Sequence, residues 1–327
     1  MKAIMHDRYG SPDVLELREI ETPLAAGNEV LVRVHAASAN ARDWHLMRGD
    51  PYLARLISSE AGLIRPKMKV PGTDFAGRVV AVGKDVARFR PGDEVYGEAN
   101  GAFAEYVCAA EGVLAPKPAS LSFEEAAAVP LAANTALVGL RDRGQVRSGT
   151  RVLINGASGG VGTFAVQVAK WLGAEVTAVC STRNVELVES LGANHVIDYT
   201  RADFTRDGRR YDVVFDLVAN RSLTDLRRAL TPRGTLVLSG GGVSTGGSLI
   251  GPMGLVITSQ LVSRFVRHRL LLLIAMPSTE NLLALGELIE SGAVTPVIDR
   301  TYPLSKAAEA IRYLEVEHAC AKVVLTV

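Results

Sequence analysis

The sequence predicts an α/β protein in which a β-rich N-terminal region precedes a doubly wound parallel sheet. Three observations predict this fold class. Short strand-like segments with Gly and Pro turns fill residues 1–122, strands alternate with helices from 123 to 276, and a glycine-rich loop joins the first strand and helix of that alternation. The 327 residues exceed what one hydrophobic core usually serves, so we expect two domains.

The N-terminal region predicts an irregular, partly barrel-like β unit. Its strand-like segments are VLVRVHAAS (30–38), GRVVAVG (77–83), DEVYG (93–97) and AEYVCA (104–109). Each is short and ends near Gly, Pro or another turn residue, which is typical of strands in such a unit.

The second region alternates between strands and helices of roughly ten residues, a pattern that predicts βαβ units. The expected strands are 151–156, 174–180, 195–199, 211–218 and 234–240, and the expected helices are 163–173, 184–192 and 223–230. From Ser278 onward the chain predicts one more helix at 280–292 and a closing strand, AKVVLTV (321–327).

The composition argues against several classes of partner. Lys plus Arg (36) nearly equals Asp plus Glu (35), so charge indicates neither nucleic acid nor an anionic membrane. Cys108, Cys180 and Cys320 lie far apart, which fits a reducing compartment and offers no structural zinc motif. The charged start MKAIMHDRYG is typical of a strand rather than a signal peptide. We therefore expect a cytoplasmic location.

The apolar segment 249–276 is the one stretch that needs a membrane test. Arg264, Arg267, His268 and Arg269 interrupt it, so that only LLLLIAM (270–276) is uninterrupted. This run is too short to span a bilayer, which takes about 20 residues. We expect a helix followed by a buried strand, and no membrane partner.

The loop INGASGGVG (154–162) is the strongest functional signal in the chain. It follows a strand, RVLI, and precedes a helix, and it fits a GxGxxG pattern as Ala157-x-Gly159-x-x-Gly162, with Ala in place of the first Gly. In a dinucleotide-binding fold such a loop brings backbone N–H groups to a pyrophosphate at a helix N-terminus. The alternative is a tight turn that only packs a helix closely on a sheet. We predict that the loop binds a dinucleotide through Gly156, Ala157, Ser158, Gly159, Gly160, Val161 and Gly162.

The end of the second strand favours NADPH over NADH. NAD-binding domains usually carry an acid there, whereas this strand ends in Cys180 and is followed by Ser181 and Arg183. An Arg and a hydroxyl suit the 2′-phosphate of NADPH, which a carboxylate would repel. The alternative is that Arg183 is a solvated residue at a helix start.

Three long motifs resemble the medium-chain dehydrogenase/reductase superfamily: 70–97 (VPGTDFAGRVVAVGKDVARFRPGDEVYG), 154–181 and 189–199 (ESLGANHVIDY). The resemblance runs nearly end to end. Within the superfamily the chain is similar to the zinc-independent quinone oxidoreductase, or zeta-crystallin-like, branch, which includes the reticulon-interacting oxidoreductase and its bacterial relatives. The resemblance implies a GroES-like catalytic domain at 1–122 completed by 277–327, a Rossmann domain at 123–276, and an active site in the cleft between them.

The sequence departs from the superfamily's zinc-dependent alcohol dehydrogenases at each catalytic metal position. Asn40 stands where the first cysteine would fall, and GTD supplies Thr73 and Asp74 in place of the family's GHE. Around the third position, PLAANTAL (130–137) offers alanine and asparagine. We therefore expect no metal. Hydride transfer to a quinone or an enone remains feasible without one, because the product anion is delocalised and the cofactor supplies the difficult step.

The resemblance also supplies further candidate site residues. Asn40 and Asp43 resemble residues that line the nicotinamide pocket, although both also suit a turn after a strand. Thr135 resembles a cofactor-contacting threonine, or is a hydroxyl inside a helix that bonds its own backbone. Tyr199 matches a tyrosine near the adenosine phosphate, or is a half-buried aromatic. Tyr52 is the candidate proton donor, although it also suits an aromatic in a lid.

The glycines after the fifth strand of the parallel sheet are candidates from position alone. Gly240 and Gly241 stand where nicotinamide should lie, or simply turn the chain. The following stretch, 242–258, is Gly-rich and then apolar, and predicts a mobile flap over an apolar pocket. LLLLIAM (270–276) should form the edge of the sheet, which predicts a homodimer that covers it.

The sequence supports one main function and two alternatives. The main function is an NADPH-dependent, metal-independent reductase of a small hydrophobic quinone or activated enone. The alternatives are a zinc-free alcohol dehydrogenase or carbonyl reductase, and an NADPH-binding protein without catalytic activity, like the crystallin members of the family.

Overall fold

The chain divides into two units, which are described separately. The computed structural model describes residues 1–57, 60–240, 251, 253–317 and 319–327. Unit 1 comprises Met1–Asn134, Met276–Gly292 and Pro296–Val327, and unit 2 comprises Thr135–Ala275 and Ala293–Thr295. The predicted boundary after residue 122 falls earlier than the observed one, because the segment 123–134 belongs to unit 1.

Unit 1 is built on a mainly antiparallel sheet that the C-terminal strand joins. The sheet order is β14 (Ile298–Pro303), β15 (Lys322–Thr326), β3 (Glu29–Ala39), β4 (Asp74–Val82), β5 (Glu94–Glu98) and β7 (Leu114–Pro116), with β6 (Tyr106–Ala110) paired to β3. A separate pair is formed by β1 (Lys2–Met5) and β2 (Glu16–Glu19). Val323 of β15 lies opposite Ala39 of β3, so the last strand of the chain completes the N-terminal sheet.

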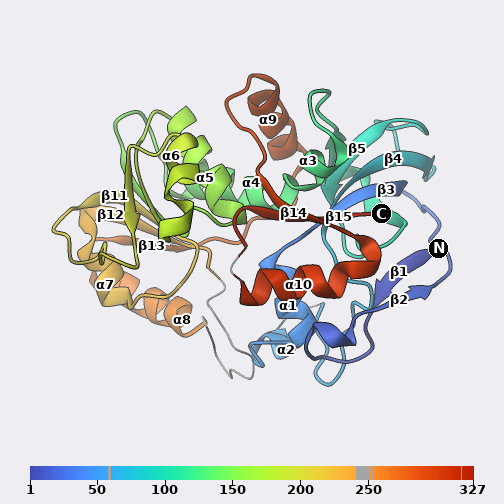
Figure 1. The fold of residues 1–327 in the computed structure, drawn as a ribbon, viewed down its shortest axis with the longest axis horizontal. Helices are drawn as coiled ribbons and strands as arrows, with labels where there is room; N and C mark the ends of the chain where they lie inside the picture. Colours follow the sequence, from blue (N-terminus) through green and yellow to red (C-terminus); the bar gives the residue numbers. More distant parts are fainter. Residues whose placement is uncertain (58–59, 241–250, 252, 318) are drawn as a thin grey trace. The chain divides into compact units, whose positions relative to one another are not determined.

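The helices of unit 1 are α1 (Ala41–Arg48), α2 (Ala54–Ile57), α3 (Phe123–Ala127), the start of α4 (Pro130–Leu137), α9 (Thr279–Glu290) and α10 (Ala307–Val316). Helix α3 begins with a capping box, since Ser122 Oγ accepts from Glu125 N and the Glu125 carboxylate accepts from Ser122 N. Helix α10 lies beside α1 (Figure 1). Beneath them the sheet buries an apolar core that includes Phe75, Val95 and Phe103.

Unit 2 is a parallel sheet in the order β10 (His195–Asp198), β9 (Glu175–Cys180), β8 (Arg151–Asn155), β11 (Tyr211–Asp216), β12 (Leu230–Leu238) and β13 (Arg269–Leu272). Numbered within the sheet this is the order 3-2-1-4-5-6 of doubly wound dinucleotide-binding domains. The chain reverses its direction of strand addition between β8 and β11. The side chains that follow these two strands therefore lie at the switch point of the sheet.

Helices cover both faces of this sheet. Helices α5 (Gly160–Trp171) and α6 (Val185–Ser190) lie on one face and α7 (Leu223–Arg228) and α8 (Met253–Val262) on the other (Figure 1). The strands contribute buried apolar residues such as Leu153, Val179, Val214 and Leu236 to the core of the unit. This arrangement confirms the predicted fold class and every helix and strand that the alternation in 151–240 predicted.

Four helices of unit 1, α1, α2, α3 and α10, escaped the sequence analysis. Asn40 and Asp43, which also suited a turn after a strand, lie at the start of α1. The segment before the last strand forms α10. The apolar segment before residue 276 does give a helix, α8, and then a strand, β13. Over the residues that the structure describes, no helix is long and apolar enough to cross a membrane.

Candidate functional site

The loop between β8 and α5 turns at Gly156, whose φ is +88°. A Cβ there would lie 2.7 Å from Cγ2 of Val218, so a larger residue is excluded on conformation and on space. The N–H groups of Gly156 and Ala157 both donate to the carbonyl of Val179, at 3.2 and 3.0 Å. The sharp turn therefore falls on Gly156, one position before the alanine in the motif, which explains why Ala157 is accepted there.

The other two glycines of the motif are needed for different reasons. A Cβ on Gly162 would lie 2.1 Å from the carbonyl oxygen of Gly156, so only glycine lets α5 pack against the end of β8. A Cβ on Gly159 would meet nothing nearer than the Gly156 oxygen at 3.4 Å. Within the described part of the chain, no neighbour requires glycine at 159. The free space there suits the close approach of a ligand to the backbone.

Helix α5 begins at Gly160, so Gly160, Val161 and Gly162 contribute the first N–H groups of a helix, which lack partners within the helix. Such a helix start attracts an anion. Ser158 lies just before it, and its hydroxyl accepts a hydrogen bond from Nδ2 of Asn184 at 2.9 Å. The loop is thus hydrogen-bonded to the segment that follows β9. The N–H groups at the start of α5 and the small side chains of the loop suit a pyrophosphate.

The switch point carries a buried amide–carboxylate pair. Asn155, at the end of β8, donates from Nδ2 to Oδ1 of Asp216 at the end of β11, at 2.8 Å. Burial raises the pKa of Asp216, whose Oδ2 is buried with no hydrogen-bond partner among the described residues. Gly240 donates its N–H to the carbonyl of Asp216 at 3.1 Å, and a Cβ on it would lie 2.6 Å from Val218 N. Gly240 thus joins the loop at the carboxyl edge of the sheet.

Two other predictions at this edge concern residues outside the described part of the chain. Gly241 lies outside it, and so does most of the predicted flap at 242–258, namely 242–250 and 252. The remainder of that segment leads into α8.

The end of β9 brings together the predicted residues Ser181, Arg183 and Tyr199. Ser181 is half-buried, Arg183 is exposed, and Tyr199 is 49 % exposed with its N–H donating to the carbonyl of Cys180. The register also places Asp198 of β10 opposite Cys180. The sequence analysis missed this carboxylate because it belongs to the neighbouring strand rather than to β9.

Asp198 is occupied by local partners. Its Oδ2 accepts from the Thr182 hydroxyl at 2.5 Å and lies 3.4 Å from Nε of Arg201, and its Oδ1 accepts from the Thr200 hydroxyl at 2.7 Å. The Thr182 hydrogen bond, with help from Thr200 and Arg201, lowers the pKa of Asp198. The residue is therefore a charged carboxylate opposite the end of β9, held by two hydroxyls and a guanidinium.

Unit 1 contains a cluster of buried polar side chains at the position of the missing zinc ligands. Asn40, Asp74 and Lys322 are 6 %, 0 % and 2 % exposed. The Lys322 ammonium donates to Oδ1 of Asn40 at 2.5 Å and lies 3.4 Å from Oδ2 of Asp74. Asn40 donates from Nδ2 to Asp74 at 3.1 Å and to the Ser38 carbonyl at 3.3 Å. The Asn40 side chain is thus held through both ends of its amide.

Further contacts tie Asp74 to the surrounding elements. Its Oδ2 accepts from the Ser38 hydroxyl at 3.2 Å, and its Oδ1 accepts from the N–H of Leu131 at the start of α4, also at 3.2 Å. Burial raises the pKa of Asp74, whereas Lys322 and the hydrogen bonds oppose that rise. The cluster therefore connects β3, β4, β15 and α4.

Asp43 and Thr73 form the rim of the cluster nearest α1. Asp43 accepts from the N–H of Asn40 at 2.8 Å and from the Thr73 hydroxyl at 3.4 Å, and burial raises its pKa to about 6. Arg42 donates to the Thr73 hydroxyl and to the Glu60 carboxylate, both at 2.5 Å. The predicted residues Asn40 and Asp43 therefore lie together in one hydrogen-bonded network.

The structure places the remaining two candidates apart from this network of hydrogen bonds. Thr135 is 7 % exposed within α4. Tyr52 is 44 % exposed and its ring lies beneath the Arg55 guanidinium, 4.6 Å from the ring centroid. Their roles in cofactor binding and proton transfer stay predictions.

Two residues of the cluster, Glu98 and Lys322, were missed by the sequence analysis. Glu98 is the last residue of β5 and lies directly opposite Asp74 in the sheet. Lys322 is the first residue of β15. Charged residues at strand ends usually lie in solvent, so nothing in the local sequence distinguishes these two from exposed ones.

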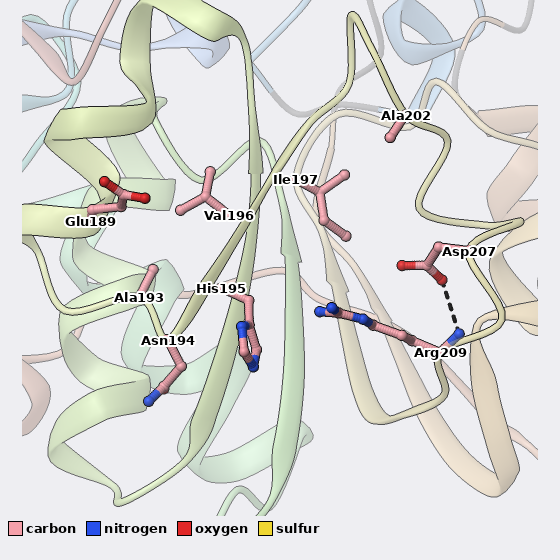
Figure 2. A pocket seen from close by; sticks show the side chains of 9 residues that line it. All are labelled: Glu189, Ala193, Asn194, His195, Val196, Ile197, Ala202, Asp207 and Arg209. Atoms are coloured by element: carbon pink, nitrogen blue, oxygen red, sulfur yellow. Dashed lines mark hydrogen bonds between the residues drawn. The ribbon is translucent and has the colours of Figure 1, made fainter.

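The pockets detected in unit 2 lie at the opposite end of the sheet from the glycine loop. One, of about 440 Å³, is formed around the start of β10 by residues that include Asn194, His195, Asp207 and Arg209 (Figure 2). A neighbouring one of about 470 Å³ shares His195 and Arg209. Ligands of open parallel sheets bind at the carboxyl ends of the strands, so we assign the site by the loop rather than by these pockets.

The chain matches two family models. Residues 26–119 match the alcohol dehydrogenase GroES-like domain, and residues 191–325 match a family described as zinc-binding dehydrogenase.

Similar proteins cover nearly the whole chain. It is 35 % identical to 2-methylene-furan-3-one reductase of Solanum lycopersicum, over 99 % of the chain and 79 % of that protein. It is also 35 % identical to the mitochondrial NAD(P)H oxidoreductase RTN4IP1 of Bos taurus, over 100 % of the chain and 89 % of that protein. The solved structure of a quinone oxidoreductase from Coxiella burnetii matches with a TM-score of 0.86 and 33 % identity, over 100 % and 99 % of the two chains.

Proposed function

Because the chain belongs to the medium-chain dehydrogenase/reductase superfamily, among its quinone oxidoreductases, we propose that it reduces a small hydrophobic quinone or activated enone with NADPH and without a metal ion. The observation that carries the proposal is the glycine loop at the switch point of unit 2. There Gly156 turns the chain, Gly162 packs the helix and Gly159 leaves space for a ligand. The names of the relatives supply the substrate class, since a quinone oxidoreductase and a reductase of a methylene-furanone both act on conjugated carbonyl compounds.

The donor set in unit 1 does not fit a catalytic zinc ion. Zinc prefers thiolate and imidazole ligands, whereas Asn40 and Thr73 offer an amide and a hydroxyl. Both side chains are already bonded to cations, Asn40 to Lys322 and Thr73 to Arg42. Lys322 and Arg42 therefore already use the side-chain oxygens that a metal ion would need.

The reaction itself requires little acid–base work from the protein. When bound, the reduced nicotinamide supplies a hydride, and the acceptor's conjugated electrons move onto its oxygen. The resulting enolate or hydroquinone anion is delocalised and takes up a proton from water. The chain's contribution is to hold both reactants in position and to exclude water.

We propose NADPH as the preferred cofactor because Arg183 follows the end of β9 and the nearby Asp198 is held by two hydroxyls and Arg201. Replacing Arg183 with alanine should raise the KM for NADPH about tenfold, the effect of losing one charge-assisted hydrogen bond, and leave the KM for NADH unchanged. Steady-state kinetics with both cofactors measure this. Arg209→Ala, at the far end of the sheet, is the matched control, and equal effects on the two cofactors would contradict the assignment.

The experiment that tests the function is an NADPH-oxidation assay across quinones, enones, aldehydes and nitro compounds, with and without a chelator. We expect turnover of quinones or enones that the chelator leaves unchanged. Turnover of aldehydes alone, or of an alcohol in a separate assay with NADP⁺, would favour an alcohol dehydrogenase or carbonyl reductase. Tight NADPH binding without any turnover would favour a non-catalytic protein.

We also propose a homodimer formed at the edge of the unit 2 sheet. Strand β13 is the last in the sheet order, and the chain just beyond it exposes Ile274 by 67 %. An apolar sheet edge favours pairing with a second copy. Light scattering should give twice the mass of one chain, and Ile274→Lys should give the monomer, whereas Leu283→Lys on α9 should leave the dimer intact. A monomeric wild-type protein at micromolar concentration would refute this.

The cytoplasmic location is likewise a proposal, supported by the wide spacing of the three cysteines.

A further inference from the structure

Glu98 is a buried acid that forms no ion pair with any residue that the structure describes. It lies opposite Asp74 in the register of β5 and β4, and the two are 5 % and 0 % exposed. Directly opposed residues of an antiparallel pair project from the same face of the sheet, so the two carboxyl groups are neighbours in a dry environment. Two ionised carboxylates in such a position would repel each other strongly.

The ion pairs of the cluster leave Glu98 out. Lys322 pairs with Asp74, and Arg42 pairs with Glu60. Among the described residues, no ion pair to Glu98 is formed, and its Oε1 is buried without a hydrogen-bond partner. The Asn134 amide on α4 lies near the Glu98 side chain. Burial and the charge of Asp74 raise the pKa of Glu98 to about 8, against the opposing effects of Asn134, Arg42 and Lys322.

We propose that Glu98 is a positioning residue, whose bound proton keeps the Lys322 ammonium on Asn40 and Asp74 and thereby holds Asn40 and the start of α1 in the working geometry. This inference rests on the proposed reductase function. With the proton in place, Glu98 adds no negative charge beside Asp74. Lys322 then keeps its ion pair with Asp74 and donates to Asn40.

Loss of the proton would change this arrangement. A second anion opposite Asp74 attracts the ammonium of Lys322, which then lies between two carboxylates rather than against Asn40. Asn40, the residue that caps the start of α1, then loses the hydrogen bond at its Oδ1. Its side chain is therefore less firmly oriented. The groups that face Glu98 from the surrounding elements are Asp74 on β4, Asn134 on α4, Arg42 on α1 and Lys322 on β15.

The test compares Glu98→Gln with the wild type, because glutamine keeps the shape and the neutral charge of the protonated acid. The matched control is Glu94→Gln at the other, more exposed end of β5. Activity with NADPH and a quinone is measured from pH 6 to 10. We expect kcat/KM of the wild type and of Glu94→Gln to fall about tenfold per pH unit above a midpoint near 8. Glu98→Gln should match the wild type within about twofold at pH 7 and lack this fall.

A second readout does not depend on activity. The folded-state pKa of Glu98 lies above its ordinary value of 4.5, so the folded protein binds the proton more tightly than the unfolded chain. This contribution to stability is full below pH 4.5 and is lost as pH rises toward about 8. The urea midpoint of the wild type should therefore fall more between pH 5 and 8 than that of Glu98→Gln.

The outcomes separate this inference from the proposed function. If Glu98→Gln shows the same alkaline fall as the wild type, or the same pH dependence of stability, the positioning role is wrong. It is also wrong if Glu98→Gln is inactive at pH 7, since the acid would then act as a donor. If the wild type turns over no acceptor, the reductase function fails, and the urea midpoints still decide whether Glu98 holds the proton.

Discussion

Replacing Gly159 with valine should abolish NADPH binding while leaving the fold intact. The φ of Gly159 is −79°, which any residue adopts, and a Cβ there would meet only the Gly156 oxygen at 3.4 Å. The isopropyl group would therefore be accepted by the protein but would occupy the space that the pyrophosphate needs. We expect the Kd for NADPH to rise at least about 100-fold, or about 2.7 kcal/mol, as measured by calorimetric titration.

Two other glycines serve as controls for this prediction. Gly162→Ala would place its Cβ 2.1 Å from the Gly156 oxygen and should lower the melting temperature. Gly112→Ala faces open space in unit 1 and should change neither binding nor stability. An unchanged Kd in the valine variant would show that the loop does not contact the cofactor at Gly159. A melting temperature as low as that of Gly162→Ala would show that the space is not free.

Replacing Lys322 with methionine should destabilise the protein by about 3–5 kcal/mol at neutral pH, since the change leaves a buried carboxylate without its cation. The Lys322 side chain is 2 % exposed and that of Asp74 is 0 % exposed, so water cannot replace the ammonium without a rearrangement. Methionine keeps much of the apolar length of the side chain, which limits the contribution from lost packing. Urea denaturation followed by circular dichroism measures the change in unfolding free energy.

The dependence on pH and a double variant identify the cause of this effect. Burial already raises the pKa of Asp74, and removal of Lys322 takes away the main opposing influence. When the pKa of a carboxyl is raised in the folded state, the folded protein loses stability as the pH increases from the unfolded-state pKa to the folded-state pKa. Lys322→Met should therefore be less destabilising at pH 5 than at pH 8. The double variant Lys322→Met/Asp74→Asn should regain a large part of the loss. If the double variant is no more stable than the single one, the loss comes from packing and not from charge.

The alternation of short apolar strands with amphipathic helices was sufficient to predict unit 2. Each of its strands from β8 to β12 falls where a run of branched residues ends in a turn. Strands repeat their apolar residues with a period of 2 and helices with a period of about 3.6 residues, and the glycine loop is a short contiguous motif. All three are local properties, which can be recognised without knowing which residues are neighbours in space. In unit 1 the same reasoning predicted the longer strands but missed three short ones, β2, β7 and β14. It also missed the helices α1, α2, α3 and α10. The polar residues at 40–43, which begin α1, suit a turn as well as a helix start.

Motif reading also placed the turning glycine one position too late. The pattern put Ala157 at the first glycine of GxGxxG, whereas the backbone turns at Gly156 with positive φ. The zinc positions, in contrast, needed no structure, because residue type alone excludes thiolate and imidazole ligands at Asn40 and Thr73.

The amino-acid sequence by itself determined the parallel sheet, the dinucleotide loop and the lack of zinc-type ligands, because each depends on residues close together in the chain. Only the tertiary structure decided that Lys322 meets Asn40 and Asp74, that Glu98 opposes Asp74, and that Asp198 lies beside the end of β9. These pairs join strands distant in sequence, and their register depends on how whole sheets pack. Burial then sets the charge state of each group, since the cost of ionising a carboxyl depends on the water and the charges around it.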